Sequence, residues 1–306
     1  MEITPVTDEM VPQVKKFLSG RKEFSYCQDW DGVFKYAWKQ EKYPYGYAIV
    51  HDGKVLGFLG TLFCDRVIHE NRIVWCNLST WIVDDCHKGA RSLAAALLAP
   101  ILKMQDIVIT SFTANEKAQK SYERMGFKRI EDHQIALPTF TSLARLGRIK
   151  ERQVLSGPDA IERHLNEKDG TILRDHRSLS CVHVLVRDSR TGRYCYVIGT
   201  ASPIRLRGLP LPSLIPIARF LSRWQYFNVC YVSDREFLAE NIGAIKNHLI
   251  KEERSLLMRY DSRLIPKRLS RFARKVAIDR LCFSSKNVQA ADVDNLYSEL
   301  VTHNTY

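Results

Sequence analysis

Small and basic side chains follow an apolar, strand-like run at residues 72–83. Lys88 and Arg91 carry the positive charges of this stretch. The small residues that would let the main chain approach a bulky group are Gly89, Ala90, Ser92 and Ala94. A helix beginning here would direct unpaired N–H groups at a phosphate or pyrophosphate. Taken alone, the stretch also fits a solvated basic turn between a strand and a helix.

A second motif, NEKAQKSYERMGFKRIE, occupies residues 115–131. Its tyrosine, Tyr122, lies in a helical pattern that ends at Gly126, a residue typical of helix C-termini. A phenol with an unperturbed pKa of about 10 is protonated at neutral pH and can donate a proton. A core aromatic residue on an amphipathic helix is the alternative interpretation of Tyr122.

Together the two segments resemble the signatures of the GNAT N-acyltransferase superfamily, over roughly residues 1–135. Asn115, Tyr122, Gly126 and Phe127 fall on the positions of the family's second motif. The family's pyrophosphate loop, Arg/Gln-x-x-Gly-x-Gly/Ala, is matched only in degenerate form, with Gly89, Ser92 and Ala94 on its three small positions. A register one or two residues different would place His87 or Lys88 at the basic position.

This resemblance implies an acyl-CoA-dependent N-acyltransferase that uses acetyl-CoA, or another acyl-CoA, as co-substrate and needs no metal. A primary amine would attack the thioester directly, and Tyr122 would be the general acid that protonates the leaving thiolate. The strand before the loop would separate from its neighbour and offer main-chain groups to the pantetheine arm. The implied cofactor-binding residues are Ile82, Val83, Lys88, Gly89, Ala90, Arg91, Ser92, Leu93, Ala94 and Asn115.

The acceptor site is predicted on the strand at residues 72–83. Simple alternation places Trp75, Asn77, Ser79 and Trp81 on one face, polar enough to line a substrate pocket. Buried hydrogen bonding would equally explain the asparagine and the serine. The general base stays open, and the candidates are Glu70, Asp84, Asp85 and His87.

The surrounding pattern predicts the elements that would position these residues. In the first part we expect helices at 5–19, 31–42, 90–104 and 115–125, a hairpin at 46–63, and strands at 72–83 and 106–113. In the second part we expect helices at 158–167, 235–251 and 266–281, a hairpin at 182–200, and strands at 227–233 and 255–261. The fold class is α/β (α+β), with a GNAT-like mixed sheet flanked by helices.

Charge divides the chain into two predicted domains, 1–140 and 141–306. The first contains 18 Lys and Arg against 17 Asp and Glu, and the second 28 against 17. The second domain is predicted to be α/β, and a degenerate GNAT-like half is one interpretation of its element order. Its segment RLRGLPLPSLIPI, at 205–217, contains three prolines that oppose a helix with free N-terminal amides, so we expect at most one cofactor site.

Composition restricts the remaining possibilities. The chain has 306 residues, 45% of them hydrophobic, and a net charge of +12, but no apolar stretch long enough to span a bilayer. Eight dispersed cysteines without a CxxC pair predict a reducing, cytoplasmic location. A small-molecule amine, for which an anionic acceptor is one option, is the expected partner, and nucleic acid is disfavoured because no reading motif accompanies the charge. The alternative function is a catalytically silent GNAT-fold module that binds acyl-CoA or a protein.

Overall fold

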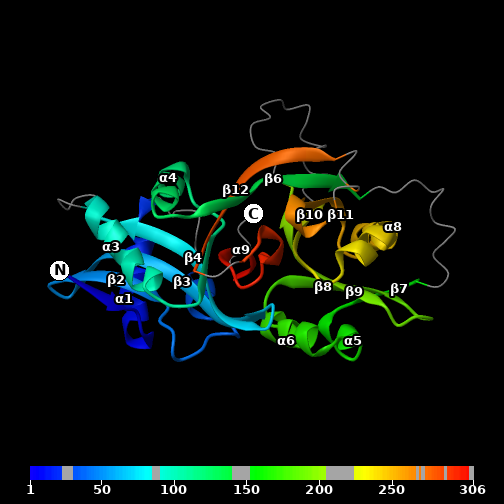
Figure 1. The fold of residues 1–306 in the computed structure, drawn as a ribbon, viewed down its shortest axis with the longest axis horizontal. Helices are drawn as coiled ribbons and strands as arrows, with labels where there is room; N and C mark the ends of the chain where they lie inside the picture. Colours follow the sequence, from blue (N-terminus) through cyan, green and yellow to red (C-terminus); the bar gives the residue numbers. More distant parts are fainter. Residues whose placement is uncertain are drawn as a thin grey trace. The chain divides into compact units, whose positions relative to one another are not determined.

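The computed structural model describes residues 1–22, 30–84, 90–139, 152–204, 224–266, 269, 273–285 and 288–302. The chain divides into two compact units, each made of more than one segment of the chain. Unit 1 contains Met1–Ile130, Asp279–Val293 and Tyr297–Thr305, and unit 2 contains Glu131–Ile278 and Asp294–Leu296. Each unit is described separately below, with the labels of Figure 1.

Unit 1 is built on a mixed sheet in the order β1-β2-β3-β4-β5-β12. Its strands are β1 (Glu2–Pro5), β2 (Gly46–His51), β3 (Lys54–Ile68), β4 (Asn71–Val83), β5 (Ile107–Ser111) and β12 (Arg274–Ser284). Only β4 and β5 run parallel, and the other neighbouring pairs are antiparallel. Its helices are η1 (Asp8–Met10), α1 (Val11–Ser19), α2 (Asp31–Phe34), α3 (Ala90–Leu102), α4 (Glu116–Arg124), η7 (Ala290–Asp292) and α9 (Glu299–Thr302).

Local sequence explains the best-defined parts of unit 1. The β2–β3 hairpin turns at Asp52 and Gly53, whose φ angles of 48° and 71° are those that an Asp-Gly turn provides. Helix α3 buries Leu97, Leu98 and Ile101 completely in a core that also contains side chains of β2–β5. Burial of such side chains stabilises the unit by roughly 1.5–3 kcal/mol each.

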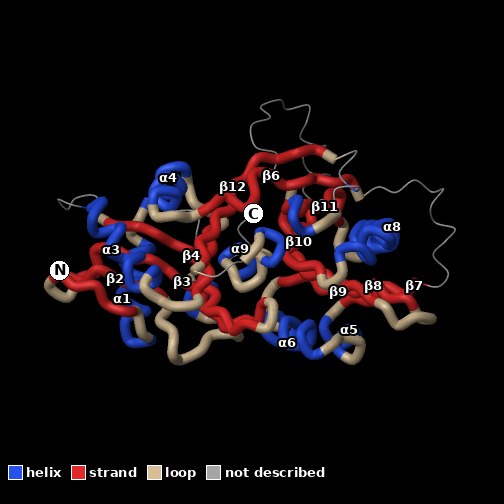
Figure 2. Tube along the Cα trace, in the orientation of Figure 1, coloured by secondary structure: helices blue, strands red, loops and turns tan. Residues whose placement is uncertain are grey.

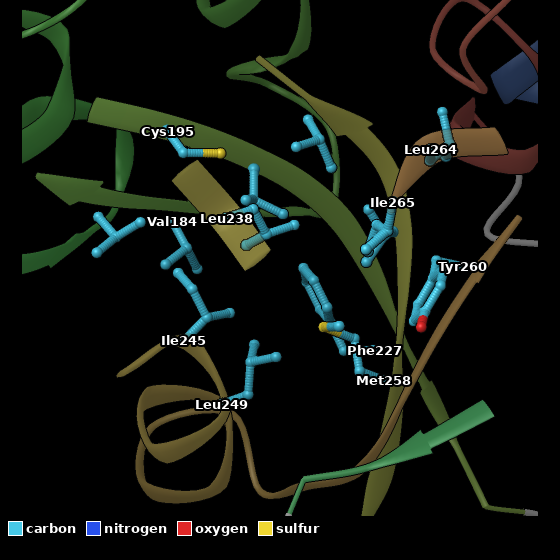
Figure 3. Close-up of a cluster of buried hydrophobic side chains, with 14 of the residues drawn as sticks. Val184, Cys195, Phe227, Leu238, Ile245, Leu249, Met258, Tyr260, Leu264 and Ile265 are labelled. Carbon is cyan, nitrogen blue, oxygen red and sulfur yellow. The ribbon is translucent and has the colours of Figure 1, made fainter. Parts of the chain in front are cut away.

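Unit 2 repeats this architecture with a sheet in the order β7-β8-β9-β10-β11-β6. Its strands are β6 (Lys128–Pro138), β7 (Arg152–Ser156), β8 (Cys181–Asp188), β9 (Tyr194–Pro203), β10 (Gln225–Val232) and β11 (Ser255–Asp261). Its helices are α5 (Pro158–Glu162), α6 (Glu167–His176), α8 (Arg235–Lys251) and η5 (Ser262–Leu264). Figure 3 shows its core, in which Leu238, Ile245 and Leu249 of α8 pack with Phe227 and Met258 of β10 and β11.

Corresponding strands of the two units have the same order and directions. In each sheet the third and fourth strands are antiparallel, and the fourth and fifth are parallel and joined through a helix, α3 or α8. In unit 1 the sixth strand, β12, comes from the C-terminal part of the sequence and pairs with β5; in unit 2 the sixth strand, β6, directly precedes β7 in the chain and pairs with β11. The sheet of unit 2, from β6 to β11, is therefore formed by a continuous stretch of chain, whereas the sheet of unit 1 is completed by a strand from the C-terminal part of the sequence.

Two predicted helices are wrong. Residues 266–281 were expected to form a basic helix, but Arg274–Ser284 is strand β12, where half-buried, β-branched Val276 and Ile278 alternate with exposed Lys275 and Ala277. In the expected helix 31–42 only Asp31–Phe34 is helical, because Tyr36 and Trp38 are both buried, a spacing of two that suits extended chain. Figure 2 shows β12 as a strand.

No helix among the described residues is long and apolar enough to cross a membrane.

Candidate functional site

Strands β4 and β5 separate part-way along their length. They pair only over Val74–Asn77 and Ile107–Thr110. Strand β4 continues to Val83 and stays paired with β3 on its other side, but no described strand covers its β5 side beyond Asn77. The sequence resemblance implied such a separation, which is the geometry that lets an extended ligand pair with strand main chain.

The hydrogen bonds between β3 and β4 determine which main-chain N–H and C=O groups of β4 face the open edge. Asp84 donates its N–H to the Leu56 carbonyl of β3 at 2.7 Å. Hydrogen-bonding direction alternates along an antiparallel strand, so Ile82 also directs its N–H and C=O at β3. Trp81 and Val83 direct their main-chain N–H and C=O groups at the open edge. Of the two predicted pantetheine-binding residues, Val83 therefore has the main-chain orientation that binding needs.

Helix α3 begins directly beyond this edge. Its first four N–H groups have no acceptor within the helix, as at any helix start. Ser92 is exposed, and Leu93 packs partly against the unit 1 core. The Ala94 carbonyl accepts a hydrogen bond of 3.1 Å from Trp81 Nε1, which links the helix to β4.

The loop before α3 is only partly described. Lys88 and Gly89, and with them His87 and Asp85, lie outside the described residues. For Ala90 and Arg91 the structure gives a helical main chain and no side-chain environment. Their predicted contacts with a pyrophosphate therefore stay predictions.

Ser92→Phe tests the predicted approach of a pyrophosphate to the start of α3. Ser92 is exposed, so the bulkier side chain is expected to leave the fold intact. It would occupy the space in front of the first-turn amides, and we expect acetyl-CoA affinity in calorimetry to fall at least 10-fold, about 1.4 kcal/mol. Lys103→Phe, near the far end of the helix, is the control. Equal acetyl-CoA affinity for Ser92→Phe and the parent would place the pyrophosphate elsewhere.

Tyr122 lies on α4 and faces the core of unit 1 with only 2% of its surface exposed. Its ring stacks on Trp81 at 4.7 Å and packs against Phe127 at 4.9 Å. Its hydroxyl is hydrogen-bonded to Ser111 at the end of β5, where β4 and β5 separate. Burial raises the pKa of Tyr122 well above its ordinary value, so the phenol holds its proton at neutral pH.

Asn115 has a local role in positioning this tyrosine. Its side chain accepts a hydrogen bond of 2.9 Å from the Ala118 N–H and so caps α4. Gly126, at φ 93°, ends the helix in a conformation that disfavours other residues. These two motif positions are explained by the helix ends, and the predicted cofactor contact of Asn115 stays a prediction.

A β-bulge in β4 changes the predicted acceptor face. Leu59 lies opposite Trp81 whereas Thr61 lies opposite Leu78, so β4 has one residue more than β3 in this interval. The extra residue reverses the alternation, and Trp81 packs against the same core as Leu78. The prediction that Trp81 shares a face with Trp75 is therefore wrong.

The remaining predicted acceptor residues are enclosed by the protein. Trp75 and Asn77 have no exposed surface, and Ser79 is half-buried. The Arg66 guanidinium lies over the Trp75 ring at 4.6 Å. Trp75 Nε1 and Ser79 Oγ are buried without a hydrogen-bond partner among the described residues. Two such donors on one strand are unusual, because buried polar groups in proteins are nearly always paired.

A C-terminal segment that the sequence analysis did not select completes this region. Asn77 donates to Thr110 Oγ1 at 3.0 Å and accepts from the Glu299 N–H at 3.2 Å. Glu299 begins α9, is 2% exposed, and accepts from the Thr113 hydroxyl at 2.9 Å. The only signal in the sequence is a single acidic residue followed by Leu300 and Val301, which does not distinguish a buried carboxyl from a surface one.

Comparison with solved structures identifies the architecture. A GCN5-related N-acetyltransferase from Anabaena variabilis superposes with a TM-score of 0.56 at 12% identity, over 92% of this chain and 72% of that one. A probable N-acyltransferase from Enterococcus faecalis gives 0.55 at 10% identity, over 92% and 72%. Eis1 from Mycobacterium abscessus gives 0.54 at 12% identity, over 93% and 74%. The chain has the GNAT superfamily fold. No protein-family model and no curated protein sequence matches it.

Unit 2 has an acidic residue at the start of α8, the helix that occupies the place of α3 in its order of elements. The helix after its fourth strand is α8, reached through Ser233 and Asp234. The proline-rich segment 205–217, on which the expectation of at most one cofactor site rested, lies outside the described residues. The Asp234 carboxylate accepts from the Phe237 N–H at 2.8 Å and from the Arg193 guanidinium at 2.9 Å. An acidic side chain thus already occupies the N-terminus of α8, where an anion would otherwise bind.

Proposed function

We propose that the protein is an acyl-CoA-dependent N-acyltransferase acting through unit 1. The observation that carries the proposal is the separation of β4 from β5, which leaves the main chain of Trp81 and Val83 at an open edge beside the start of α3. An acyl-CoA would pair its pantetheine arm with that edge and set its pyrophosphate at the α3 amides. Acetyl is the acyl group that the family resemblance favours.

Tyr122 is the proposed general acid. Its hydroxyl lies at the end of β5, at the fork between the two strands, and the buried phenol is protonated. The amine nitrogen attacks the thioester carbonyl, the C–S bond breaks, and the phenol proton goes to the thiolate sulfur. Because the amine attacks directly, no covalent enzyme intermediate is needed.

The proposed acceptor is a small-molecule primary amine bound along β4. Ser79, which is half-buried on β4, is the residue of the predicted set that an acceptor could contact, whereas Trp75 and Asn77 have no exposed surface. The excess of Lys and Arg after residue 140 favours an acceptor that also carries a negative group. The free thiols of six described cysteines are compatible with the proposed cytoplasmic location.

The function is tested by acetyl-CoA binding and by release of the CoA thiol with a panel of amines. We expect saturable binding in calorimetry and amine-dependent thiol release with amino sugars, polyamines or amino-acid derivatives. Binding without turnover across the panel would instead favour the silent acyl-CoA-binding module, which the degenerate loop residues Ser92 and Ala94 support. Absence of binding would exclude both functions.

A further inference from the structure

A buried carboxyl lies in unit 1 where the two proposed reactants would meet. Glu299 is held from two sides: Thr113 donates to its Oε1, and its own N–H donates to Asn77. Asn77 is the last β4 residue paired with β5, and Thr113 follows the end of β5 by two residues. The carboxyl is therefore fixed at the fork between the two strands.

The proposed acid lies at the same fork. Tyr122 reaches it through Ser111, the last residue of β5, and the charge of Glu299 adds to burial in raising the pKa of Tyr122. Asn77 also donates to Thr110, so this one side chain of β4 links β5 and α9 through hydrogen bonds. Tyr122, which holds its proton, and Glu299, which can accept one, thus both lie at the fork where the thioester would bind.

The surroundings of Glu299 place its change of charge near neutral pH. Burial raises the pKa of Glu299 to about 7, against the lowering effects of the Thr113 hydrogen bond and of Arg280. Arg280, on β12, is the cation that acts on it, and Arg280 is itself bound to the Phe112 carbonyl at 2.5 Å. A carboxyl that changes charge near pH 7 suits proton removal, because the best catalytic pKa lies near the working pH.

We propose that Glu299 is the general base of the acyl transfer, an inference that rests on the proposed function. As the N–C bond forms and the C–S bond breaks, an amine proton passes to the Glu299 carboxylate, directly or through one water. The Tyr122 proton passes to the thiolate, giving amide and free thiol. The proton held by Glu299 then restores the Tyr122 hydroxyl, so that both groups return to their starting states.

Glu299→Gln keeps the size and the hydrogen-bonding shape of the side chain and removes its basicity. We expect kcat to fall about 10²–10⁴-fold, with acetyl-CoA affinity in calorimetry unchanged. In the parent, kcat should rise with pH through about 7 as Glu299 ionises, and this rise should be absent in the variant. An acceptor whose own amine titrates well outside this range keeps the two ionisations apart.

The raised pKa of Glu299 can also be tested through the pH dependence of protein stability, without an activity assay. The folded pKa of Glu299 lies above its ordinary value of 4.5, so the folded state holds a proton that the unfolded state has lost. The stability of the parent should therefore fall as pH rises from 4.5 to about 7. Glu299→Gln lacks this loss, so its thermal midpoint should increase relative to that of the parent across the same pH range. Glu131→Gln, at a buried glutamate of unit 2 held by Ser262, is the matched control and should leave the kcat profile unchanged.

Thr113→Val is the second variant, for use if Glu299→Gln does not fold. It removes a hydrogen bond that lowers the pKa of Glu299, so the midpoint of the kcat profile should move to higher pH. An active parent with an unaltered kcat and pH profile in Glu299→Gln, or an unmoved midpoint in Thr113→Val, overturns the assignment. An inactive parent that still shows the stability difference refutes the proposed function, and the role of Glu299 as base falls with it.

Discussion

Tyr122→Phe is expected to lower kcat by about 10²–10⁴-fold. The variant keeps the ring that stacks on Trp81 and loses only the hydroxyl bonded to Ser111. Acetyl-CoA affinity should change little, because the proposed pantetheine and pyrophosphate contacts are made by β4 and α3. Steady-state rates of thiol release, with calorimetry on the same samples, measure both quantities.

A control variant at a second buried tyrosine distinguishes an effect on catalysis from an effect on packing. Tyr43 belongs to the same core, stacks on Phe63 and donates its hydroxyl to Asp65. Tyr43→Phe should lower stability by about 1 kcal/mol and leave kcat unaltered. If Tyr122→Phe retains the parent kcat while chemistry is rate-limiting, Tyr122 is a core aromatic residue and the acid must be sought elsewhere.

Local pattern predicted those elements whose partners lie close by in sequence. The span of α8 is that expected from residues 235–251, because Asp234 caps its start and the apolar periodicity continues to its end. The β2–β3 hairpin follows from Asp52 and Gly53, and α4 from the cap at Asn115 and the glycine at 126. In each case the deciding interaction lies within a few residues of the signal.

The features that sequence missed depend on distant partners. The bulge that turns Trp81 toward the core exists only in the register of β4 against β3. Strand β12 has a basic, amphipathic sequence that fits a helix equally well, and its pairing with β5 decides the outcome. Glu299 becomes a candidate base only because Asn77 and Thr113 hold it at the fork, more than 180 residues away in sequence.

The return of the C-terminal elements β12 and α9 to unit 1 gives the largest expected effect on folding. A fragment of residues 1–140 retains β6 but lacks β12 and α9, and with them the fully buried Leu281 and nearly buried Leu300 and Val301. Loss of a buried leucine side chain alone costs about 2–5 kcal/mol, against a net stability of roughly 5–15 kcal/mol for a whole protein. We expect this fragment, expressed alone, to be poorly soluble and to lack a cooperative thermal transition.

A cut at residue 140 separates β5 from β12 and β6 from β11, so we expect the two fragments to fold only together. Residues 141–306 contain β12 but lack β6, whose Ile135 and Leu137 are part of the unit 2 core. Co-expressed, the two fragments can restore the β5–β12 and β6–β11 pairings, so they should co-purify as a 1:1 complex with a cooperative transition and with acyl-CoA binding. A 1–140 fragment that is soluble and melts cooperatively on its own would show that β12 and α9 are dispensable, and the proposed role of Glu299 in unit 1 would then lose its structural basis.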